Sequence, residues 1–163
     1  MVVQVAVCGP GACSDEEAAL ARRVGRLLAE RGAVVLCGGG TGVMAAVADG
    51  ARAGGGLVIG IRPDGERGAA HDGLSATVFT GLGEARNAVL VNSADAVISV
   101  GGSWGTLSEI ALALRRGGVP VVCLAGWQVR DGAGTLVAGP VPVGTAEEAV
   151  AIALAGRPDA GSA

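Results

Sequence analysis

Three Gly-rich turns contain most of the residues whose types and spacing could do chemistry. They span Gly9–Ser14, Gly38–Met44 and Gly101–Glu109, and each lies between an apolar run and a helical pattern. Free backbone N–H groups at a helix N-terminus stabilise an anion, and glycines let it approach the backbone closely. The turns therefore predict a phosphate-binding site. The expected binding residues are Gly9, Gly11, Gly39, Gly40, Thr41, Gly42, Gly101, Gly102, Ser103, Trp104, Gly105 and Thr106.

For the first two turns, a purely structural role is the alternative. The first could be a tight turn before a capped helix, and the second could allow a helix to pack closely against a strand. The first turn also resembles a dinucleotide fingerprint. However, Ser14 stands at the third glycine, and no acidic residue follows the second strand, so we do not expect an NAD site.

Glu109 is the candidate catalytic carboxylate of the third turn. It follows Thr106 by three residues, so both side chains lie on one face of the expected helix 104–116. A carboxylate beside an anion site is electrostatically unfavourable, which favours a functional role for Glu109. The alternative is that Glu109 is there only because the positive helix N-terminus stabilises its charge. An apolar stripe is expected to face the sheet instead, formed by Leu107, Ile110, Ala111 and Leu114.

Arg86 is the candidate catalytic cation. It lies in the first turn of an expected helix, where the helix dipole disfavours a positive charge. Its position after the fourth expected strand places it at the ligand edge of the sheet. Together with Glu109 it would form a cation–carboxylate site, whereas the alternative is a solvated surface arginine.

Apolar runs alternate with helical patterns along the whole chain. Runs such as Val2–Cys8 are typical of strands buried on both faces, and capping boxes at Ser14–Glu17 and Thr145–Glu148 mark helix starts. Strands are expected at Val2–Cys8, Ala33–Cys37, Leu57–Ile61, Ala76–Thr80, Ala96–Val100 and Val119–Leu124. Helices are expected at 14–31, 43–53, 84–92 and 104–116, and from 145 onward.

This alternation predicts an α/β protein with a single Rossmann-like, doubly wound parallel sheet and helices on both faces. We expect one nucleotide- or phosphate-binding domain over residues 1–156 and a frayed tail over 157–163. Ligands of such sheets bind beyond the carboxyl ends of the strands, where the three turns lie. The polar segment 62–73 is expected to be a mobile loop, with His71 solvated rather than catalytic.

The composition excludes several functions. The chain has 163 residues, a net charge of −3 and 12 basic residues, all of them arginine. Without lysine it cannot form the Schiff base of a pyridoxal-phosphate enzyme or a Walker A loop. An acidic chain with only three aromatic side chains does not favour a nucleic-acid partner.

The remaining sequence features indicate an ordinary cytoplasmic protein. None of the four cysteines, Cys8, Cys13, Cys37 and Cys123, has the C-x-x-C spacing of a zinc site. Three of them end buried strands, as core residues of a reducing compartment do. No signal peptide or membrane-spanning run is recognisable. We expect no metal, no cofactor and no membrane partner.

Taken together, these residues resemble the LOG-like superfamily, often misnamed lysine decarboxylases, over about Val2 to Leu124. The superfamily includes nucleotide phosphoribohydrolases and molybdenum-cofactor carrier proteins. In the hydrolase signature Pro-Gly-Gly-x-Gly-Thr-x-x-Glu, Gly101 stands at the proline and Ser103 at the second glycine. The matching positions are Gly102, Gly105, Thr106 and Glu109.

Two further motifs support the resemblance. Arg86-Asn87 stands at the family's Arg-Lys pair, and Gly38–Met44 is one residue shorter than the family's Gly-Gly-Gly-x-x-Gly-Leu-Met. These departures look more like the branch grouped with the cofactor carriers. The resemblance implies ligand contact by Asn87 and catalysis by Arg86 and Glu109.

The resemblance implies two functions. The first is hydrolysis of the N-glycosidic bond of a nucleoside 5′-monophosphate to free base and ribose 5-phosphate, which we rank slightly higher. The alternative is a non-catalytic carrier of the molybdenum cofactor or a related phosphorylated ligand, and a third is a nucleotide-sensing module. The expected partner is a small phosphorylated ligand, either a nucleoside monophosphate or a molybdopterin-like compound. The resemblance also implies a homodimer or higher homo-oligomer.

Overall fold

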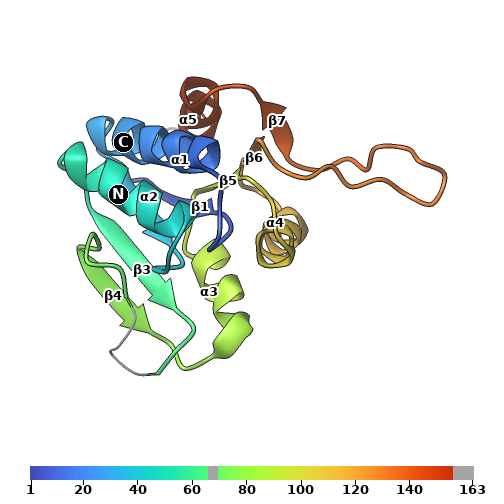
Figure 1. The fold of residues 1–163 in the computed structure, drawn as a ribbon. Coiled ribbons are helices and arrows are strands. Elements are labelled where there is room, and N and C mark those ends of the chain that lie inside the picture. Colours follow the sequence, from blue (N-terminus) through green and yellow to red (C-terminus); the bar gives the residue numbers. More distant parts are fainter. Residues whose placement is uncertain (66–69, 156–163) are drawn as a thin grey trace, which may run out of the picture.

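The computed structural model describes residues 1–65 and 70–155 (Figure 1). Seven parallel strands form one sheet in the order β4-β3-β2-β1-β5-β6-β7. The strands are β1 (Gln4–Cys8), β2 (Val34–Cys37), β3 (Val58–Arg62), β4 (Ala76–Phe79), β5 (Ala96–Val100), β6 (Val121–Leu124) and β7 (Val141–Val143). The strand order reverses between β1 and β5, which confirms the predicted doubly wound α/β fold.

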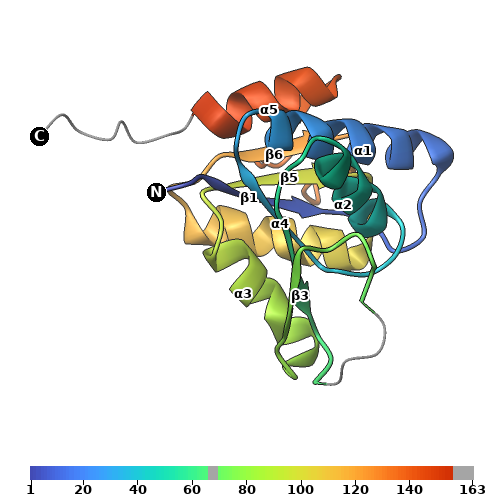
Figure 2. The same cartoon turned by 90° about the vertical axis from the view of Figure 1, so that its left-hand side faces the viewer.

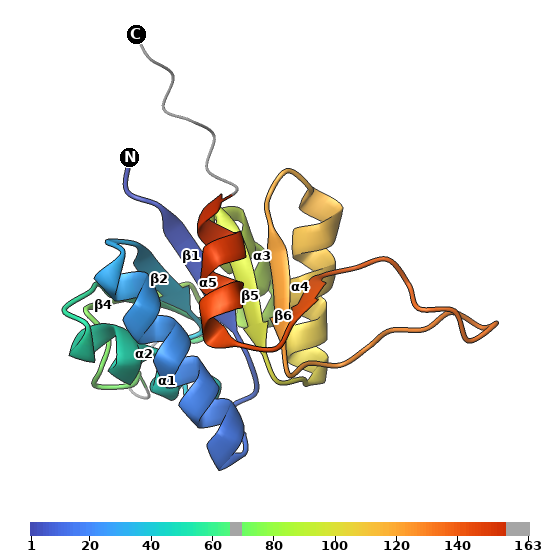
Figure 3. The same ribbon diagram turned by 90° about the horizontal axis from the view of Figure 1, so that it is seen from above.

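Helices cover both faces of the sheet (Figures 2 and 3). One face packs against α1 (Asp15–Glu30), α2 (Val43–Ala53) and α5 (Ala146–Ala155), and the other against α3 (Arg86–Asn92) and α4 (Trp104–Arg116). A short 3-10 turn, η1 (Gly83–Ala85), leads into α3. Among the described helices, none is both long and apolar enough to span a bilayer.

Local sequence signals explain how the first two helices are placed. At the start of α1, the Ser14 hydroxyl accepts a hydrogen bond from the Glu17 amide at 3.1 Å, and the Glu17 carboxylate accepts one from the Ser14 amide at 2.8 Å. This is the predicted capping box. Two glycines, Gly25 and Gly50, let α1 and α2 approach closely, because a Cβ at either would collide with backbone of the other helix.

The structure extends the predicted strand pattern at its C-terminal end. Between β6 and β7 lies an extended segment, residues 125–140, which we call the arm; neither it nor β7 was predicted. Arg62 was expected in a loop but is the last residue of β3. The expected tail at 157–163 lies outside the described residues, as do positions 66–69 of the expected loop.

The predicted orientation of α4 is wrong for most of its apolar stripe. Of Leu107, Ile110, Ala111 and Leu114, only Ile110 is buried. The other buried residues of α4 are Thr106, Glu109 and Ala113. Apolar periodicity identifies one face of a helix, but it does not say whether the sheet or another part of the molecule contacts that face.

Candidate functional site

A cavity of about 270 Å³ lies at the carboxyl edge of the sheet, where the strand order reverses. It brings together the first, second and third Gly-rich turns and the start of α3. The lining residues are Cys8, Gly9, Gly11, Gly38, Met44, Pro63, Glu84, Arg86, Asn87, Ser103, Gly105, Thr106 and Glu109.

The predicted site residues divide into two groups. Those that line the cavity are Gly9, Gly11, Arg86, Asn87, Ser103, Gly105, Thr106 and Glu109, and their role in binding stays a prediction. Those that do not line it are Gly39, Gly40, Thr41, Gly42, Gly101, Gly102 and Trp104. Sequence reasoning did not select Cys8, Gly38, Met44, Pro63 or Glu84, because nothing in their local sequence distinguishes them from core or loop residues.

Two residues of the second turn join it to the first turn instead of facing the cavity. The Thr41 hydroxyl donates a hydrogen bond to the Gly11 carbonyl at 2.8 Å. Gly42 has φ of 62°, and a Cβ there would collide with the backbone of Pro10 and Gly11. A side chain at this position is therefore excluded both by conformation and by space. Gly42 and Thr41 fix the shape of the cavity wall.

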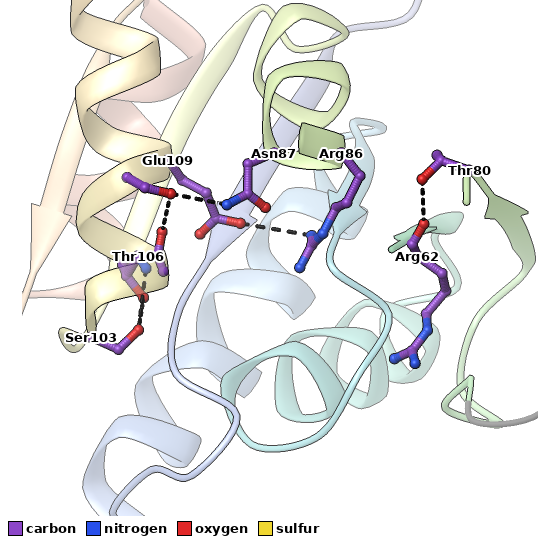
Figure 4. Close-up of polar contacts among 9 residues, drawn as sticks. Arg62, Thr80, Arg86, Asn87, Ser103, Thr106 and Glu109 are labelled. Carbon is purple, nitrogen blue, oxygen red and sulfur yellow. Dashed lines mark hydrogen bonds and ion pairs between the residues drawn. The ribbon is translucent and has the colours of Figure 1, made fainter. Parts of the chain in front are cut away.

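Arg86 is buried in this cavity and is not a solvated surface residue. Its guanidinium Nη1 lies 3.7 Å from Oε1 of Glu109, and the two side chains are 14% and 8% exposed (Figure 4). Gly38 makes room for it, since a Cβ there would come within 2.7 Å of Nη1. Within the described residues, Nε and Nη1 of Arg86 are buried without a hydrogen-bond acceptor.

Unsatisfied buried donors have an energetic cost. Leaving one without an acceptor costs about 1–3 kcal/mol, and more when the group is charged. A ligand that brought anionic oxygens into the cavity would remove this cost.

The Glu109 carboxyl tends to keep its proton. Burial raises its pKa above the ordinary value, while the Arg86 charge and a hydrogen bond from the Cys8 thiol partly oppose that rise. Burial also raises the pKa of the Cys8 thiol well above its ordinary value, and the nearby Glu109 raises it further. Glu109 is thus able to hold a proton at a pH where an exposed glutamate is ionised, and Cys8 stays a thiol.

The N-terminus of α4 forms another wall of the cavity. The Ser103 hydroxyl caps the helix by accepting a hydrogen bond from the Thr106 amide at 3.1 Å, and it lies 2.9 Å from the Thr106 hydroxyl. In the part of the chain that the structure describes, the amides of Trp104 and Gly105 have no acceptor. These two N–H groups and the positive end of the helix dipole form an anion-binding arrangement.

Asn87 holds the two cavity helices together. Its side-chain amide donates a hydrogen bond to the Ser108 hydroxyl at 2.9 Å, and Ser108 in turn donates one to the Gly105 carbonyl at 2.9 Å. Asn87 is 7% exposed. This chain of contacts fixes the start of α3, and with it Arg86, against the first turn of α4 (Figure 4).

The doubly wound sheet, with the Arg–Glu pair and the capped α4 N-terminus at its switch point, defines a LOG-like ligand-binding fold. The sequence matches the SLOG cluster4 family over residues 2–138, so the protein belongs to this family. A relative in Archaeoglobus fulgidus, an uncharacterized protein, is 47% identical over 116 residues, which are 71% of this chain and 76% of the relative.

Solved structures of similar proteins include carriers of the molybdenum cofactor. The molybdenum cofactor binding protein from Rippkaea orientalis matches with a TM-score of 0.84 and 31% identity, over 95% of this chain and 97% of that chain. The molybdenum cofactor carrier protein from Chlamydomonas reinhardtii matches with a TM-score of 0.72 and 32% identity, over 78% and 79% of the respective chains. The predicted membership of a LOG-like branch near these carriers is confirmed.

Proposed function

We propose that the cavity binds the phosphate end of a small ligand, and that this ligand is the molybdenum cofactor or a related molybdopterin held without turnover. The observation that supports it is the buried Arg86 guanidinium, whose Nε and Nη1 lack an acceptor. It lines the same cavity as Gly105 at the α4 N-terminus, whose amide has no acceptor among the described residues. A phosphate could accept hydrogen bonds from both walls.

The choice of cargo rests on relatives and on sequence departures. Two similar structures are proteins named for the molybdenum cofactor. Gly101, Ser103 and Asn87 stand where the hydrolase signature has Pro, Gly and Lys. A cavity of about 270 Å³ is slightly smaller than typical ligand pockets of roughly 300–1,000 Å³. It would enclose the phosphate and leave the pterin ring nearer to the mouth.

The test is direct loading with the cargo. The protein is mixed with molybdenum cofactor released from a molybdoenzyme and passed through gel filtration, and the pterin in the protein peak is quantified by its fluorescence after oxidation. We expect pterin to co-elute with the protein, at up to one pterin per binding site. Pterin that elutes entirely apart from the protein would rule out the carrier function.

The second candidate is the phosphoribohydrolase, and Glu109 is the observation that favours it. A carboxyl with a raised pKa beside Arg86 can act as a general acid or position a water molecule. Cleavage of an N-glycosidic bond passes through an oxocarbenium-like state, which a carboxylate stabilises. Binding of the phosphate at the α4 N-terminus would hold the ribose near Glu109.

Base release separates the two candidates. AMP, GMP and CMP are incubated with the protein, and free base is measured by chromatography. The hydrolase predicts release that falls by about 10²–10⁴ in Glu109→Gln, because a positioned acid or base is removed. The carrier predicts no release from the parent protein. Undiminished release in Glu109→Gln would exclude a catalytic role for Glu109.

Cytoplasmic location and homo-oligomeric state also remain proposals. Both follow from the resemblance and from composition.

A further inference from the structure

Glu84 is a second carboxylate that lines the cavity, in addition to Glu109. The two have different surroundings. Glu109 is buried, lies 3.7 Å from Arg86 and accepts a hydrogen bond from the Cys8 thiol. Glu84 is exposed, so it belongs to the mouth of the cavity, and within residues 1–65 and 70–155 no cation forms an ion pair with it. Glu109 thus has partners within the protein, whereas the Glu84 carboxylate is open to a ligand.

The turn around Glu84 holds its backbone in place. Glu84 is the middle residue of η1, and the preceding Gly83 donates a hydrogen bond from its amide to the Pro63 carbonyl at 3.1 Å. Gly83 has φ of 56°, a conformation that favours glycine. Pro63 follows the last residue of β3, so this contact joins η1 to the sheet. Because Arg86 comes two residues later, the structure fixes Glu84 relative to the anion-binding cation.

A carboxylate at the mouth of an anion site is electrostatically unfavourable. Glu84 repels the phosphate that Arg86 and the α4 N-terminus attract. Hydrogen bonds from the same ligand to the carboxylate would offset this repulsion, since charge-assisted hydrogen bonds are among the strongest in proteins. A carboxylate has only acceptors. The part of the ligand at the mouth is therefore expected to carry N–H or O–H donors.

We propose that Glu84 determines which ligand is bound, by accepting hydrogen bonds from the ring N–H and the adjacent amino group of an aminopyrimidinone ring. This inference rests on the proposed phosphate site, which would leave the ring of the ligand at the mouth. Two parallel N–H donors match the two oxygens of one carboxylate. The pterin of molybdopterin and the guanine of GMP share this edge.

Other bases fit the Glu84 carboxylate less well. Adenine and cytosine have a ring nitrogen acceptor beside their amino group, and two acceptors that face each other repel. Hypoxanthine keeps the ring N–H of guanine but lacks the amino group. A site built to accept N–H donors discriminates strongly against analogues that lack them. Glu84 is therefore expected to favour guanine and pterin rings.

The test compares GMP with IMP, which differs from GMP only by the missing amino group. Binding is measured by calorimetry on the full chain. We expect the parent protein to bind GMP about tenfold more tightly than IMP, the effect of one charge-assisted hydrogen bond. In Glu84→Gln the two should bind with similar affinity, because a side-chain amide has one acceptor oxygen and directs its own N–H toward the second donor. The affinity for IMP should not fall, since a negative charge near the phosphate is removed.

Glu30→Gln is the matched control. Glu30 is an exposed carboxylate at the end of α1, which leads to the start of β2 and so lies at the edge of the sheet opposite the cavity. The substitution changes the net charge by the same amount as Glu84→Gln and should keep the tenfold preference for GMP. Both variants should keep the parent's circular dichroism spectrum, because both side chains are exposed.

Three results would overturn the role of Glu84. The first is a parent protein that binds GMP and IMP equally. The second is a Glu84→Gln variant that keeps the preference for GMP. The third is a variant that loses affinity for GMP and IMP to the same extent, since the carboxylate would then contact a group that both share, such as a ribose hydroxyl.

Guanosine and inosine separate this inference from the phosphate site. The ratio of the affinities for GMP and guanosine reports on the phosphate, and the ratio for GMP and IMP reports on Glu84. If both monophosphates bind more tightly than their nucleosides but equally to each other, the phosphate site is supported and the role of Glu84 is wrong. If GMP binds no more tightly than guanosine, the phosphate site is wrong, and a preference over IMP that Glu84→Gln abolishes still assigns the ring contact to Glu84.

Loading with the molybdenum cofactor distinguishes a pterin from guanine. In the gel-filtration assay described above, Glu84→Gln should retain several-fold less pterin than the parent protein, and Glu30→Gln should retain as much as the parent. Less pterin in Glu84→Gln alone assigns the edge to a pterin. Unchanged pterin loading together with a lost preference for GMP assigns it to guanine. A Glu84→Gln variant that keeps both its pterin and its preference for GMP would overturn the proposal.

Discussion

The two faces of α4 differ in an instructive way. The face toward the sheet buries a carboxyl and a hydroxyl, those of Glu109 and Thr106, beside Arg86. Another face presents Ala111 and Leu114 to an apolar groove of about 630 Å³ between α4 and the arm, and Leu114 is 40% exposed. Ile110 and Ala113 are also buried, as in an ordinary surface helix, so the unusual features are the two buried polar side chains on the inner face and the exposed leucine outside it.

The two faces of α4 therefore have different requirements. The inward face forms a polar cavity whose buried groups are costly unless a ligand satisfies them. The outward face forms an apolar surface that is costly unless a partner covers it. Substitutions on the inward side should therefore change ligand binding, and those on the outward side should leave it unchanged.

The largest expected effect is the loss of binding in Arg86→Ala. Each charge-assisted hydrogen bond contributes about 1.5–3 kcal/mol, so losing two from Nε and Nη1 should weaken binding of a phosphorylated ligand by about 100-fold or more. Arg115→Ala, which removes an exposed arginine from the last turn of α4, is the matched control. Calorimetry with AMP or molybdenum cofactor measures both. Equal losses in the two variants would mean that Arg86 acts only through net charge.

A smaller effect is expected where the two faces meet, at Gly102. Gly102→Val should weaken ligand binding by about tenfold or more and displace Trp127, because the new side chain would occupy the position of the indole. The control is Gly132→Ala, since Gly132 does not line the cavity and a Cβ there would meet nothing within 4 Å. Tryptophan fluorescence and calorimetry read out the two sites. An unfolded Gly102→Val chain by circular dichroism would show that this glycine is required for folding.

Most strands of the sheet and the start of α1 could be predicted because buried strands and helix caps leave local patterns in the sequence. β1 and β5 are apolar apart from Gln4 and Ser99, and the capping box at Ser14 forms as predicted. The pairing of Arg86 with Glu109 was also accessible, since the doubly wound topology brings the ends of neighbouring strands to one edge.

Other features could not be predicted because they depend on contacts between distant segments. Gly38 was one glycine among three, and only the packed structure places the Arg86 guanidinium over it. Cys8 resembled a core residue, although its thiol contacts Glu109. The apolar residues of α4 were assigned to the sheet because the arm, a short hairpin with four glycines and one proline, has no strong periodicity.

A modest effect is expected from the ligand's phosphate alone. AMP should bind at least tenfold more tightly than adenosine, because each charge-assisted hydrogen bond to the phosphate is worth about 1.5–3 kcal/mol. The Leu114→Asp variant should retain this preference, since Leu114 lies on the outward face and does not line the cavity. Calorimetry with both ligands on both proteins measures it. Equal affinities for AMP and adenosine in the parent protein would remove the phosphate site.

The smallest effect, and the one most specific to the inward face, is the pH dependence of stability. Because burial raises the pKa of Glu109, the folded chain holds a proton there at pH values where the unfolded chain has lost it. Stability should therefore fall as pH rises from the ordinary glutamate pKa, 4.5, through the raised value, by at most about 1.4 kcal/mol per pH unit. Glu109→Gln lacks this titrating group, so its free energy of unfolding in urea should rise relative to that of the parent across that pH window. Above the window, the difference between the two proteins should be constant.

Arg86 and Cys8 contact the same carboxyl and remain in both proteins. Glu16→Gln, which changes an exposed carboxylate in the first turn of α1, should follow the parent's slope. If the parent instead gains stability relative to Glu109→Gln as pH rises, Glu109 is ionised in the folded chain and stabilised by Arg86.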